Sequence, residues 1–300
     1  MSRSILVVTL SNIGDAIMTT PVLERLHQLY PEASVDLVAD PRSSALFEHC
    51  PYRGHIFLKE KRLGWRGTLA LVRRLRKRRY DLVVDLRTDG LALLLRSRKR
   101  LLKWGRKPLG PHAVEDLISI LRPIDPEGRI PPARVWPGPE GEARASRLLE
   151  GSRGSRWLAL APGANWEPKI WPADRFAQLA NALRRHWDDC ILLGGDGDQA
   201  RCQAVAKAIE GPTRNLCGKT DLPTAAAVAS RCVLLVGNDS GPGHLAAAAG
   251  TPTLTLFGPG QPTRYHPWGQ RSRWIAAPDR RLESLTVEQV LVEAEAALSS

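Results

Sequence analysis

The chain has 300 residues, 43% of them hydrophobic and 25% charged, a balance typical of a globular protein long enough for two domains. It contains no run of 18 apolar residues, and its first residues lack the long apolar stretch of a signal peptide, so we expect a cytoplasmic protein without a membrane span. The five cysteines have no metal-binding spacing, which favours reduced packing thiols and no metal site.

The net charge of +12 is concentrated in one segment. Residues 53–107 contain 19 Lys or Arg and 4 Asp or Glu. Any single basic run is typical of a solvated helix face, but two dense runs in one domain indicate an anionic partner. A phosphorylated glycan, an anionic lipid surface and a nucleic acid all fit this charge.

The first half of the chain alternates apolar runs with helical periodicity. The apolar runs predict strands at 4–10, 33–40, 55–60 and 80–87. Apolar side chains at helical spacing predict helices at 16–31, 69–80 and 91–102. Such alternation indicates βαβ units around a parallel sheet.

A proline- and glycine-rich stretch at 129–141 predicts a domain boundary, which we place between residues 139 and 140. The alternation then starts again. Strands, each followed by a loop, are predicted at 157–164, 190–198 and 232–241, with a further strand at 251–259. Helices are predicted at 172–187, 199–210, 222–231, 244–250 and 285–300. The chain therefore contains two α/β halves of similar plan.

Ligands of open parallel sheets bind beyond the carboxyl ends of the strands, where four loops of this chain carry polar residues. In the first loop, Asp15 follows Gly14 near a helix start and is either a helix cap or a general base. In the second, Lys169 can reach phosphate oxygens, with Asn165 beside it, although an exposed loop lysine is the plainer reading. Trp171, in the same loop, is expected to be a core residue.

The third loop, GGDGD, carries Asp198, which is either a ribose contact or part of a glycine-rich turn. The fourth loop, NDSGPGH, leads into an alanine-rich helix and is the most specific pattern of the chain. A helix N-terminus favours an anion, and its glycines let phosphate oxygens approach the backbone. The residues proposed here are Asp239, Ser240, Gly241, Gly243 and His244.

Together these stretches resemble the heptosyltransferases of glycosyltransferase family 9, which use ADP-heptose to build the lipopolysaccharide core. The resemblance rests on SNIGDAIMTTPVLERL, YDLVVDLRTDGLALLLRS, APGANWEPKIWP and NDSGPGHLAAAAGTPTLTLFGP, and covers nearly the whole chain. It implies a GT-B fold, with two Rossmann-like domains whose parallel sheets face each other across a cleft. Residues 1–139 would bind the acceptor and residues 140–285 the nucleotide-sugar, with the helix at 286–300 packing back onto the first domain.

The resemblance also implies roles for residues. Asp15 would be the catalytic base of a metal-independent, inverting transfer from ADP-heptose. Lys169 would contact the diphosphate and the sugar, Asp239 the sugar, and Thr220 would lie near the adenine. Asp198 would lie near the ribose, and the loop from Ser240 to His244 would hold the diphosphate. Arg87 and Arg96 are the candidate acceptor contacts, since the lipopolysaccharide inner core is anionic. Peripheral contact with the inner face of the cytoplasmic membrane would then be weakened by salt.

The chain departs from the family where Asn165 and Trp166 stand in place of small hydroxyl residues. This departure leaves open a related enzyme that uses another nucleotide-sugar or a non-lipid acceptor. A nucleic-acid-binding protein would explain the basic runs, but the chain has no recognition motif and few aromatic residues to stack bases. An inactive relative is the third alternative, and the retained Asp15, Lys169 and Asp239 argue against it.

Overall fold

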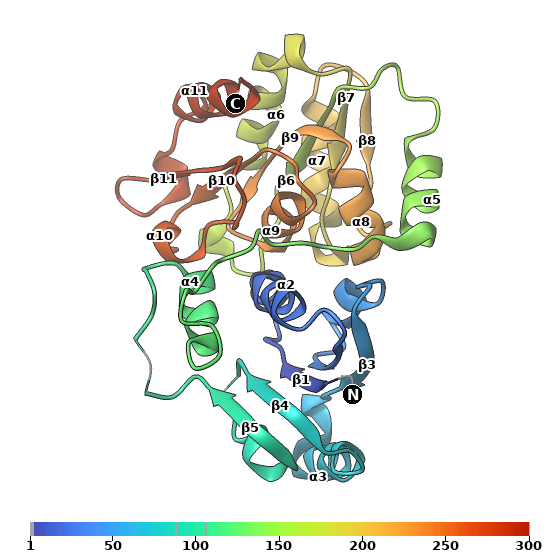
Figure 1. Cartoon of the computed structure of the whole chain (residues 1–300). Helices are drawn as coiled ribbons and strands as arrows, with labels where there is room; N and C mark the ends of the chain where they lie inside the picture. Colours follow the sequence, from blue (N-terminus) through green and yellow to red (C-terminus); the bar gives the residue numbers. More distant parts are fainter. Residues whose placement is uncertain (1–2, 88, 106, 300) are drawn as a thin grey trace. The chain divides into compact units, whose positions relative to one another are not determined.

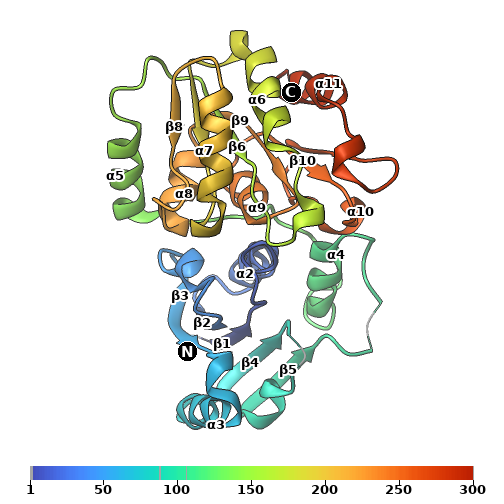
Figure 2. The same ribbon diagram turned by 180° about the vertical axis from the view of Figure 1, so that it is seen from behind.

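A computed structural model describes residues 3–87, 89–105 and 107–299 of the chain. The chain divides into two compact units, Met1–Trp136 and Pro137–Ser300. The division lies in the proline-rich stretch, slightly before the boundary placed at 139/140. Each unit contains a parallel sheet with helices packed on it (Figure 1 and Figure 2).

The first unit contains a five-stranded sheet in the order β3-β2-β1-β4-β5, with every strand pair parallel. Its strands are β1 (Ser4–Val8), β2 (Ser34–Ala39), β3 (Arg53–Leu58), β4 (Tyr80–Asp85) and β5 (Ser97–Leu102). Its helices are α1 (Ile13–Met18), α2 (Thr20–Leu29), α3 (Gly64–Leu75) and α4 (Ala113–Ile118). Short 3-10 turns are η1 (Ser44–Phe47), η2 (Lys61–Leu63), η3 (Leu91–Leu94) and η4 (Ser119–Leu121).

The central strand β1 is buried on both faces, as its continuous apolar run predicted. Successive side chains of a strand point to opposite faces of the sheet, so Leu6 and Val8 share one face. On that face they belong to a cluster with Leu71, Val72 and Leu75, the buried stripe of α3. The amphipathic pattern of α3 therefore fixes which side of the helix faces the sheet and which side faces solvent.

A buried ion pair holds the first unit together away from the sheet. The guanidinium of Arg25, on α2, donates to both carboxylate oxygens of Asp125 at 2.7 and 2.6 Å. Both side chains are nearly inaccessible, at 11% and 3% exposure. The two-point geometry orients α2 against the loop that follows η4.

One predicted element of the first unit is wrong. Residues 91–102 were expected to form a helix, but they form η3 and then the edge strand β5. The basic side chains of β5 are exposed, which suits a strand with a neighbour on one side only. Arg100 folds back and donates to the carbonyls of Ala92 and Leu95, at 3.0 and 2.6 Å, which closes the turn between β4 and β5.

The second unit contains a six-stranded sheet in the order β11-β10-β9-β6-β7-β8, also parallel throughout. Its strands are β6 (Trp157–Ala161), β7 (Asp189–Leu192), β8 (Thr213–Asn215), β9 (Cys232–Asn238), β10 (Thr253–Phe257) and β11 (Ser272–Ala276). Its helices are α5 (Gly138–Leu149), α6 (Ala173–Ala182), α7 (Gln199–Ala208), α8 (Leu222–Ala229), α9 (Gly241–Ala248), α10 (Pro262–Tyr265) and α11 (Val287–Leu298). Its 3-10 turns are η5 (Glu167–Lys169), η6 (Arg184–His186), η7 (Asp196–Asp198) and η8 (Leu282–Ser284).

Helices cover both faces of this sheet. One core joins the sheet to α6, α7 and α11, and the other joins it to α5, α8 and α9 (Figure 1 and Figure 2). Trp171 is fully buried in the first of these cores, where its indole nitrogen donates to the carbonyl of Leu285 at 2.8 Å. The expectation that Trp171 is a core residue is therefore confirmed.

The buried face of α11 belongs to the second unit. Val290, Ala294 and Ala297 belong to the core of the second unit, where α11 packs against α6 and the sheet. Packing of the helix at 286–300 onto the first domain stays a prediction. The small residues of α11 let it approach the sheet of its own unit closely; Ser300 lies outside the described residues.

The cysteines and the hydropathy of the helices agree with the sequence. All five cysteines are buried free thiols, and burial raises the pKa of Cys50 to about 11 and that of Cys232 to about 12. Within the described residues, no helix combines the length and the apolar character needed to cross a bilayer.

Candidate active site

Three of the four loops singled out in the sequence lie at one edge of the second sheet. Strands β9, β6 and β7 are neighbours and run parallel, so the loops that follow them leave from the same, carboxyl edge. These loops carry Lys169, Asp198 and the segment 239–244. The sheet therefore brings together polar residues that are up to about 75 positions apart in sequence, by its order alone.

A salt bridge joins two of the predicted residues. The Nζ atom of Lys169, at the end of η5, lies 2.6 Å from the Oδ2 atom of Asp239, which directly follows β9. The Lys169 side chain is 26% exposed and that of Asp239 only 9%. The pair thus holds the lysine head group at the edge of the sheet and gives the carboxylate of Asp239 a cationic partner.

Asn238 fixes the loop that carries Lys169. The sequence motifs did not identify it as a site residue. It is fully buried at the end of β9. Its amide nitrogen donates to the carbonyl of Pro162 at 2.9 Å, and its amide oxygen accepts from the backbone nitrogen of Trp171 at 3.0 Å. One side chain therefore fixes both ends of the loop that carries Lys169. The signal was available: Asn238 is a polar residue at the end of an apolar strand.

Gly260 was also missed. A Cβ atom at this position would lie 2.7 Å from the Oδ2 atom of Asp239, the atom that bonds Lys169. The loop after β10 therefore passes so close to the carboxylate that a side chain there would force it to shift. No motif of the sequence distinguished Gly260 from other turn glycines.

The helix α9 begins at the segment 239–244, as predicted. Ser240 is the N-cap in extended conformation, and its hydroxyl donates to the carbonyl of Asn238 at 3.3 Å instead of capping the helix. The first N–H groups of a helix have no partner within it. Since Ser240 is the N-cap and Pro242 has no N–H, the backbone of Ser240, Gly241 and Gly243 supplies these donors, and the buried His244 follows them. The start of α9 is thus open to an anionic ligand.

Asp198 ends η7 and directly precedes α7, where it closes its own loop. Its Oδ2 atom accepts from the backbone nitrogen of Gly195 at 3.0 Å, and it makes no side-chain cap to α7. A Cβ atom at Gly163 would lie 2.1 Å from the Asp198 carboxyl carbon. The loops after β6 and β7 therefore pack against each other through this carboxylate, which is half-buried.

Asn165 and Thr220 are placed more loosely. Asn165 is exposed in the loop between β6 and η5, and Trp166 beside it is 53% exposed. Thr220 is half-buried and lies one residue before Asp221, whose side chain caps α8 by accepting from the backbone nitrogen of Thr224 at 2.9 Å. Nothing in these contacts assigns either residue a ligand.

Asp15 lies at the corresponding edge of the first sheet, after β1. It occupies the first turn of α1 and is half-buried. It does not cap the helix: Asn12 is the N-cap residue, and its amide nitrogen donates to the Oδ2 atom of Asp15 at 2.9 Å. The other carboxylate oxygen has no hydrogen bond assigned to it among the described contacts. This geometry is compatible with a general base.

The two candidate acceptor contacts, Arg87 and Arg96, lie at opposite edges of the first sheet. Arg87 follows the carboxyl end of β4, and its Nε atom lies 3.5 Å from the Oδ2 atom of Asp89, which also pairs with Lys59. Arg96 precedes the amino end of β5, where its carbonyl accepts from the backbone nitrogen of Tyr80 at 3.0 Å. Since β4 and β5 are parallel, Arg96 lies at the opposite edge from Asp15 and Arg87. We therefore withdraw Arg96 as a partner of these two residues.

Both units have the α/β architecture of GT-B glycosyltransferases, with charged residues at the carboxyl edges of parallel sheets. The sequence model of glycosyltransferase family 9 (heptosyltransferase) matches residues 91–291. The chain belongs to this family and is a glycosyltransferase of the heptosyltransferase type. The resemblance drawn from the sequence motifs is thereby confirmed.

Individual relatives agree with this assignment. The chain is 28% identical over 283 residues to lipopolysaccharide heptosyltransferase 3 of Escherichia coli K12, covering 85% of this chain and 82% of the relative. Its fold is similar to a family 9 glycosyltransferase of Veillonella parvula, with a TM-score of 0.89, 24% identity and coverage of 99% and 97%. It is also similar to E. coli ADP-heptose lipopolysaccharide heptosyltransferase II, with a TM-score of 0.82, 24% identity and coverage of 100% and 99%.

Proposed function

We propose that this enzyme transfers a heptose from ADP-heptose to a hydroxyl group of an anionic acceptor, with the lipopolysaccharide inner core as the favoured acceptor. Its membership of the heptosyltransferase family supports the type of reaction. The donor and the acceptor are supported by its similarity to lipopolysaccharide heptosyltransferase 3 and to ADP-heptose lipopolysaccharide heptosyltransferase II of E. coli. The cytoplasm is the proposed location.

The observation that carries the donor assignment is the salt bridge between Lys169 and Asp239 beside the start of α9. A lysine held in place and a row of backbone donors together form a site for a diphosphate. In the bound state we expect Lys169 to contact the diphosphate and Asp239 to accept from sugar hydroxyls. The amides of Ser240, Gly241 and Gly243 and the hydroxyl of Ser240 would take the remaining phosphate oxygens, with His244 as a further predicted contact.

The rest of the donor is assigned by position. Asp198 would lie near the ribose, because it lies on the loop next to that of Lys169. Thr220 would lie near the adenine, and Asn165 near the sugar. These three assignments come from the family resemblance and stay predictions.

The proposed reaction is a single displacement with inversion. Asp15 takes the proton of the acceptor hydroxyl while its oxygen attacks the anomeric carbon, and ADP leaves. Negative charge grows on the leaving diphosphate, where preorganised donors stabilise it, and such electrostatic stabilisation is usually the largest contribution to catalysis. We propose that Lys169 and the amides of α9 supply this stabilisation without a metal ion. Arg87 would contact the acceptor.

A second candidate is a related glycosyltransferase with another donor sugar or a non-lipid acceptor. The observation that favours it is the loop of Lys169, where the exposed side chains of Asn165 and Trp166 stand next to the proposed donor site. A large indole there would change which sugars fit. Nucleotide preference alone cannot separate two sugars on the same nucleotide, so turnover with different sugars decides between the candidates.

Thermal unfolding in the presence of ADP, UDP, GDP and CDP tests the donor class. A ligand at 100 times its dissociation constant adds about 2.7 kcal/mol to stability, which is an easily measured shift. We expect ADP to stabilise the protein most, and Lys169→Ala to reduce the effect of ADP. Lys207→Ala, which removes an exposed lysine of α7, is the matched control and should respond to ADP like the wild type.

The other possible outcomes distinguish a wrong nucleotide from a wrong donor site. A larger shift with UDP or GDP would leave the diphosphate site in place but contradict ADP-heptose as the donor. No shift with any nucleotide would contradict the donor site itself.

A further inference from the structure

One surface of the first unit exposes apolar side chains that nothing in the proposed reaction uses. Eleven large apolar residues are exposed in the described chain, and four of them lie within residues 58–69. They are Leu58, Leu63, Trp65 and Leu69, with exposed fractions of 43%, 55%, 72% and 41%. Isolated exposed apolar residues are ordinary, but a cluster of this kind marks an interaction site.

The geometry of α3 places two of these residues, Trp65 and Leu69, on its exposed side. Leu71, Val72 and Leu75 are buried against the sheet, so the opposite side of α3 faces solvent. Trp65 and Leu69 are one helical turn apart and therefore neighbours on this outer side, with Arg73 one turn further. The guanidinium of Arg66 lies 5.6 Å from the centroid of the Trp65 ring, so the cation and the indole form one amphipathic unit.

The charge along α3 and the turns on either side of it has a single sign. Residues 61–79 contain nine Lys or Arg and no Asp or Glu. Arg66, Arg73, Arg74 and Arg76 are exposed along α3 and its C-cap. A protein-binding helix would normally mix both signs at its rim, whereas exposed Trp and Leu among arginines are typical of a helix that lies at a membrane interface.

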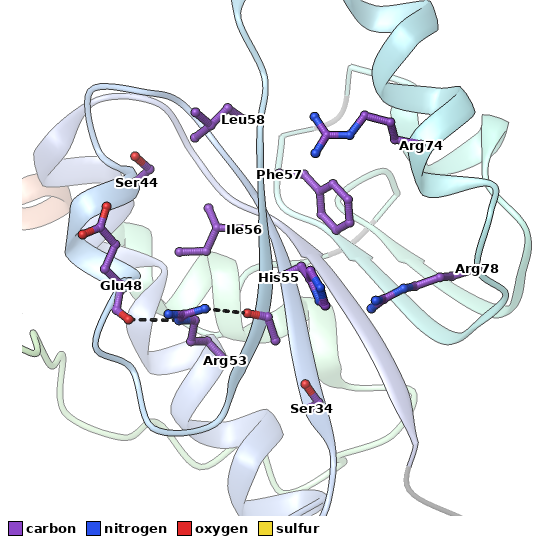
Figure 3. A pocket seen from close by; sticks show the side chains of 11 residues that line it. Ser34, Ser44, Glu48, Arg53, His55, Ile56, Phe57, Leu58, Arg74 and Arg78 are labelled. Atoms are coloured by element: carbon purple, nitrogen blue, oxygen red, sulfur yellow. Dashed lines mark hydrogen bonds between the residues drawn. The ribbon is translucent and has the colours of Figure 1, made fainter.

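A pocket adjoins this helix, and its lining contains three arginines, Arg53, Arg74 and Arg78, against one carboxylate, Glu48 (Figure 3). It has a volume of about 680 Å³ and runs along the free edge of β3. Arg74 and Arg78 extend into it from the end of α3, next to Phe57 and His55 of the strand. The guanidinium of Arg74 lies 5.5 Å from the centroid of the Phe57 ring, and that of Arg78 is fixed by the buried carboxylate of Asp36 at 3.0 Å. The pocket offers these cations to a phosphate beside the apolar surface.

We propose that α3 and the adjoining end of β3 form a docking surface for a bilayer of anionic phospholipids. Leu63, Trp65 and Leu69 enter the headgroup region, where an indole ring is especially favourable. The arginines of α3 contact the lipid phosphates, and the pocket of Arg74 and Arg78 takes one phosphate. Docking of this kind is peripheral and reversible, since the helix remains packed on its own sheet.

Sedimentation with lipid vesicles tests this surface without any substrate, so the result does not depend on the proposed function. We expect binding to vesicles of phosphatidylcholine with phosphatidylglycerol, weak binding to phosphatidylcholine alone, and weaker binding as salt rises. The double variant Trp65→Ser with Leu69→Gln should lose about tenfold or more in vesicle affinity. The double variant Arg66→Gln with Arg73→Gln should lose about 25-fold, at about fivefold for each cation.

Matched controls lie in the second unit. Val292→Gln removes an apolar side chain of α11 that is 65% exposed, and Arg185→Gln with Arg281→Gln removes two exposed cations from elsewhere. All variants change exposed side chains, so their unfolding should match the wild type. The controls should keep wild-type affinity. Equal loss in the arginine control would show attraction by net charge alone and overturn the docking surface.

Two further outcomes would also overturn the proposal. Equal binding to both kinds of vesicle would remove the role of lipid charge. Tight binding to a random-sequence oligonucleotide that depends on Arg66 and Arg73 but not on Trp65 and Leu69, with no vesicle binding, would identify a surface for nucleic acid instead.

A site-specific probe gives an independent measurement. The five native cysteines are buried, so Leu69→Cys introduces an accessible thiol that can be labelled with an environment-sensitive dye. We expect a blue shift of the dye on anionic vesicles and little change on phosphatidylcholine. An unchanged spectrum on vesicles that bind the protein would place the contact elsewhere and contradict the role of α3.

Discussion

The carboxyl edges of the two sheets are built in different ways. In the second unit the polar side chains hold one another: Lys169 pairs with Asp239, and Asn238 ties both ends of the lysine loop. In the first unit Asp15 accepts a hydrogen bond from Asn12, an exposed residue of its own turn. Arg87 pairs with Asp89. The contacts described for the second edge form a connected network, whereas those described for the first edge join Asp15 to Asn12 and Arg87 to Asp89.

The difference fits the two substrates that we propose. A diphosphate is compact and always the same, so a site that is rigid before binding loses little entropy when the ligand arrives. An acceptor glycan is large and variable. A general base such as the one proposed at Asp15 needs a carboxylate oxygen that can reach the acceptor hydroxyl, and this does not require a network of fixed side chains. The comparison predicts that changes at the second edge mainly affect nucleotide binding and that changes at Asp15 mainly affect turnover.

The largest effect is expected at Asp15. Asp15→Asn keeps the size of the side chain but removes the base, so turnover should fall by about 10²–10⁴-fold. Affinity for ADP, measured by calorimetry, should stay within a factor of about two, because the proposed donor residues lie on the other unit. Asn12→Ala, which removes a hydrogen bond but no base, is the control and should cost much less. Near-normal turnover of Asp15→Asn would break the comparison.

The stability of the first unit depends on a buried ion pair away from its carboxyl edge. Asp125→Ala leaves the guanidinium of Arg25 buried without its partner and should lower the free energy of unfolding by about 3–5 kcal/mol. Urea unfolding followed by circular dichroism measures this, and two transitions are possible for two units. Arg129→Ala, which breaks an exposed pair with Glu127, should change stability by less than about 1 kcal/mol. Equal losses of unfolding free energy in Asp125→Ala and Arg129→Ala would show that burial does not determine how much an ion pair stabilises the fold.

Lys169 tests the network of the second edge. Lys169→Ala should weaken ADP binding by about 10- to 100-fold, as expected for a charged hydrogen bond. Asp239→Asn should weaken it less, since the lysine stays but is no longer held. A double-mutant cycle of the two changes then reports their coupling, which should differ clearly from zero. Additive effects would mean that the salt bridge does not help to position Lys169.

Asn238→Ala tests whether ADP binding depends on the hydrogen bonds that fix the Lys169 loop as well as on Lys169 itself. Asn238→Ala leaves the carbonyl of Pro162 and the amide of Trp171 without their partner and should cost about 1–3 kcal/mol of stability. ADP affinity should fall as well, because both ends of the lysine loop are released. Asn165→Ala, an exposed change in the same loop, should leave stability within about 0.5 kcal/mol. An unchanged ADP affinity in Asn238→Ala would show that the loop holds its shape without the brace.

The smallest effect is expected from Asp89 in acid. Burial opposes ionisation of Asp89, but the hydrogen bond from Lys59 and the charges of Lys59 and Arg87 outweigh it and lower its pKa. A lowered pKa stabilises the folded state above the unfolded value of about 3.9, and this stabilisation is lost as the pH falls through the folded pKa. The urea midpoint of the wild type should therefore fall more steeply below pH 4 than that of Asp89→Asn. If the urea midpoints of the wild type and of Asp89→Asn depended on pH in the same way, the lowered pKa of Asp89 would be contradicted.

The plan of the fold was predictable where periodicity was strong. The run at residues 4–10 and the loop NDSGPGH were identified from their patterns, since a buried strand and a helix N-terminus each have a local signature. The strand β5 was not, because its basic residues have no alternation that distinguishes an edge strand from a helix. Asn238 and Gly260 escaped notice because their importance depends on neighbours far away in the sequence. Arg96 was misplaced for the same reason, since the direction of β5 decides its edge.

The measurement that tests the central claim most directly is turnover with a defined donor. The purified enzyme is incubated with a heptose-deficient lipopolysaccharide inner core and either ADP-heptose, ADP-glucose or UDP-glucose, and the product is followed by mass spectrometry together with nucleotide release. We expect ADP release and a mass increase of one heptose with ADP-heptose alone, and neither with Asp15→Asn. Transfer from ADP-glucose or UDP-glucose in preference to ADP-heptose would contradict the proposed donor.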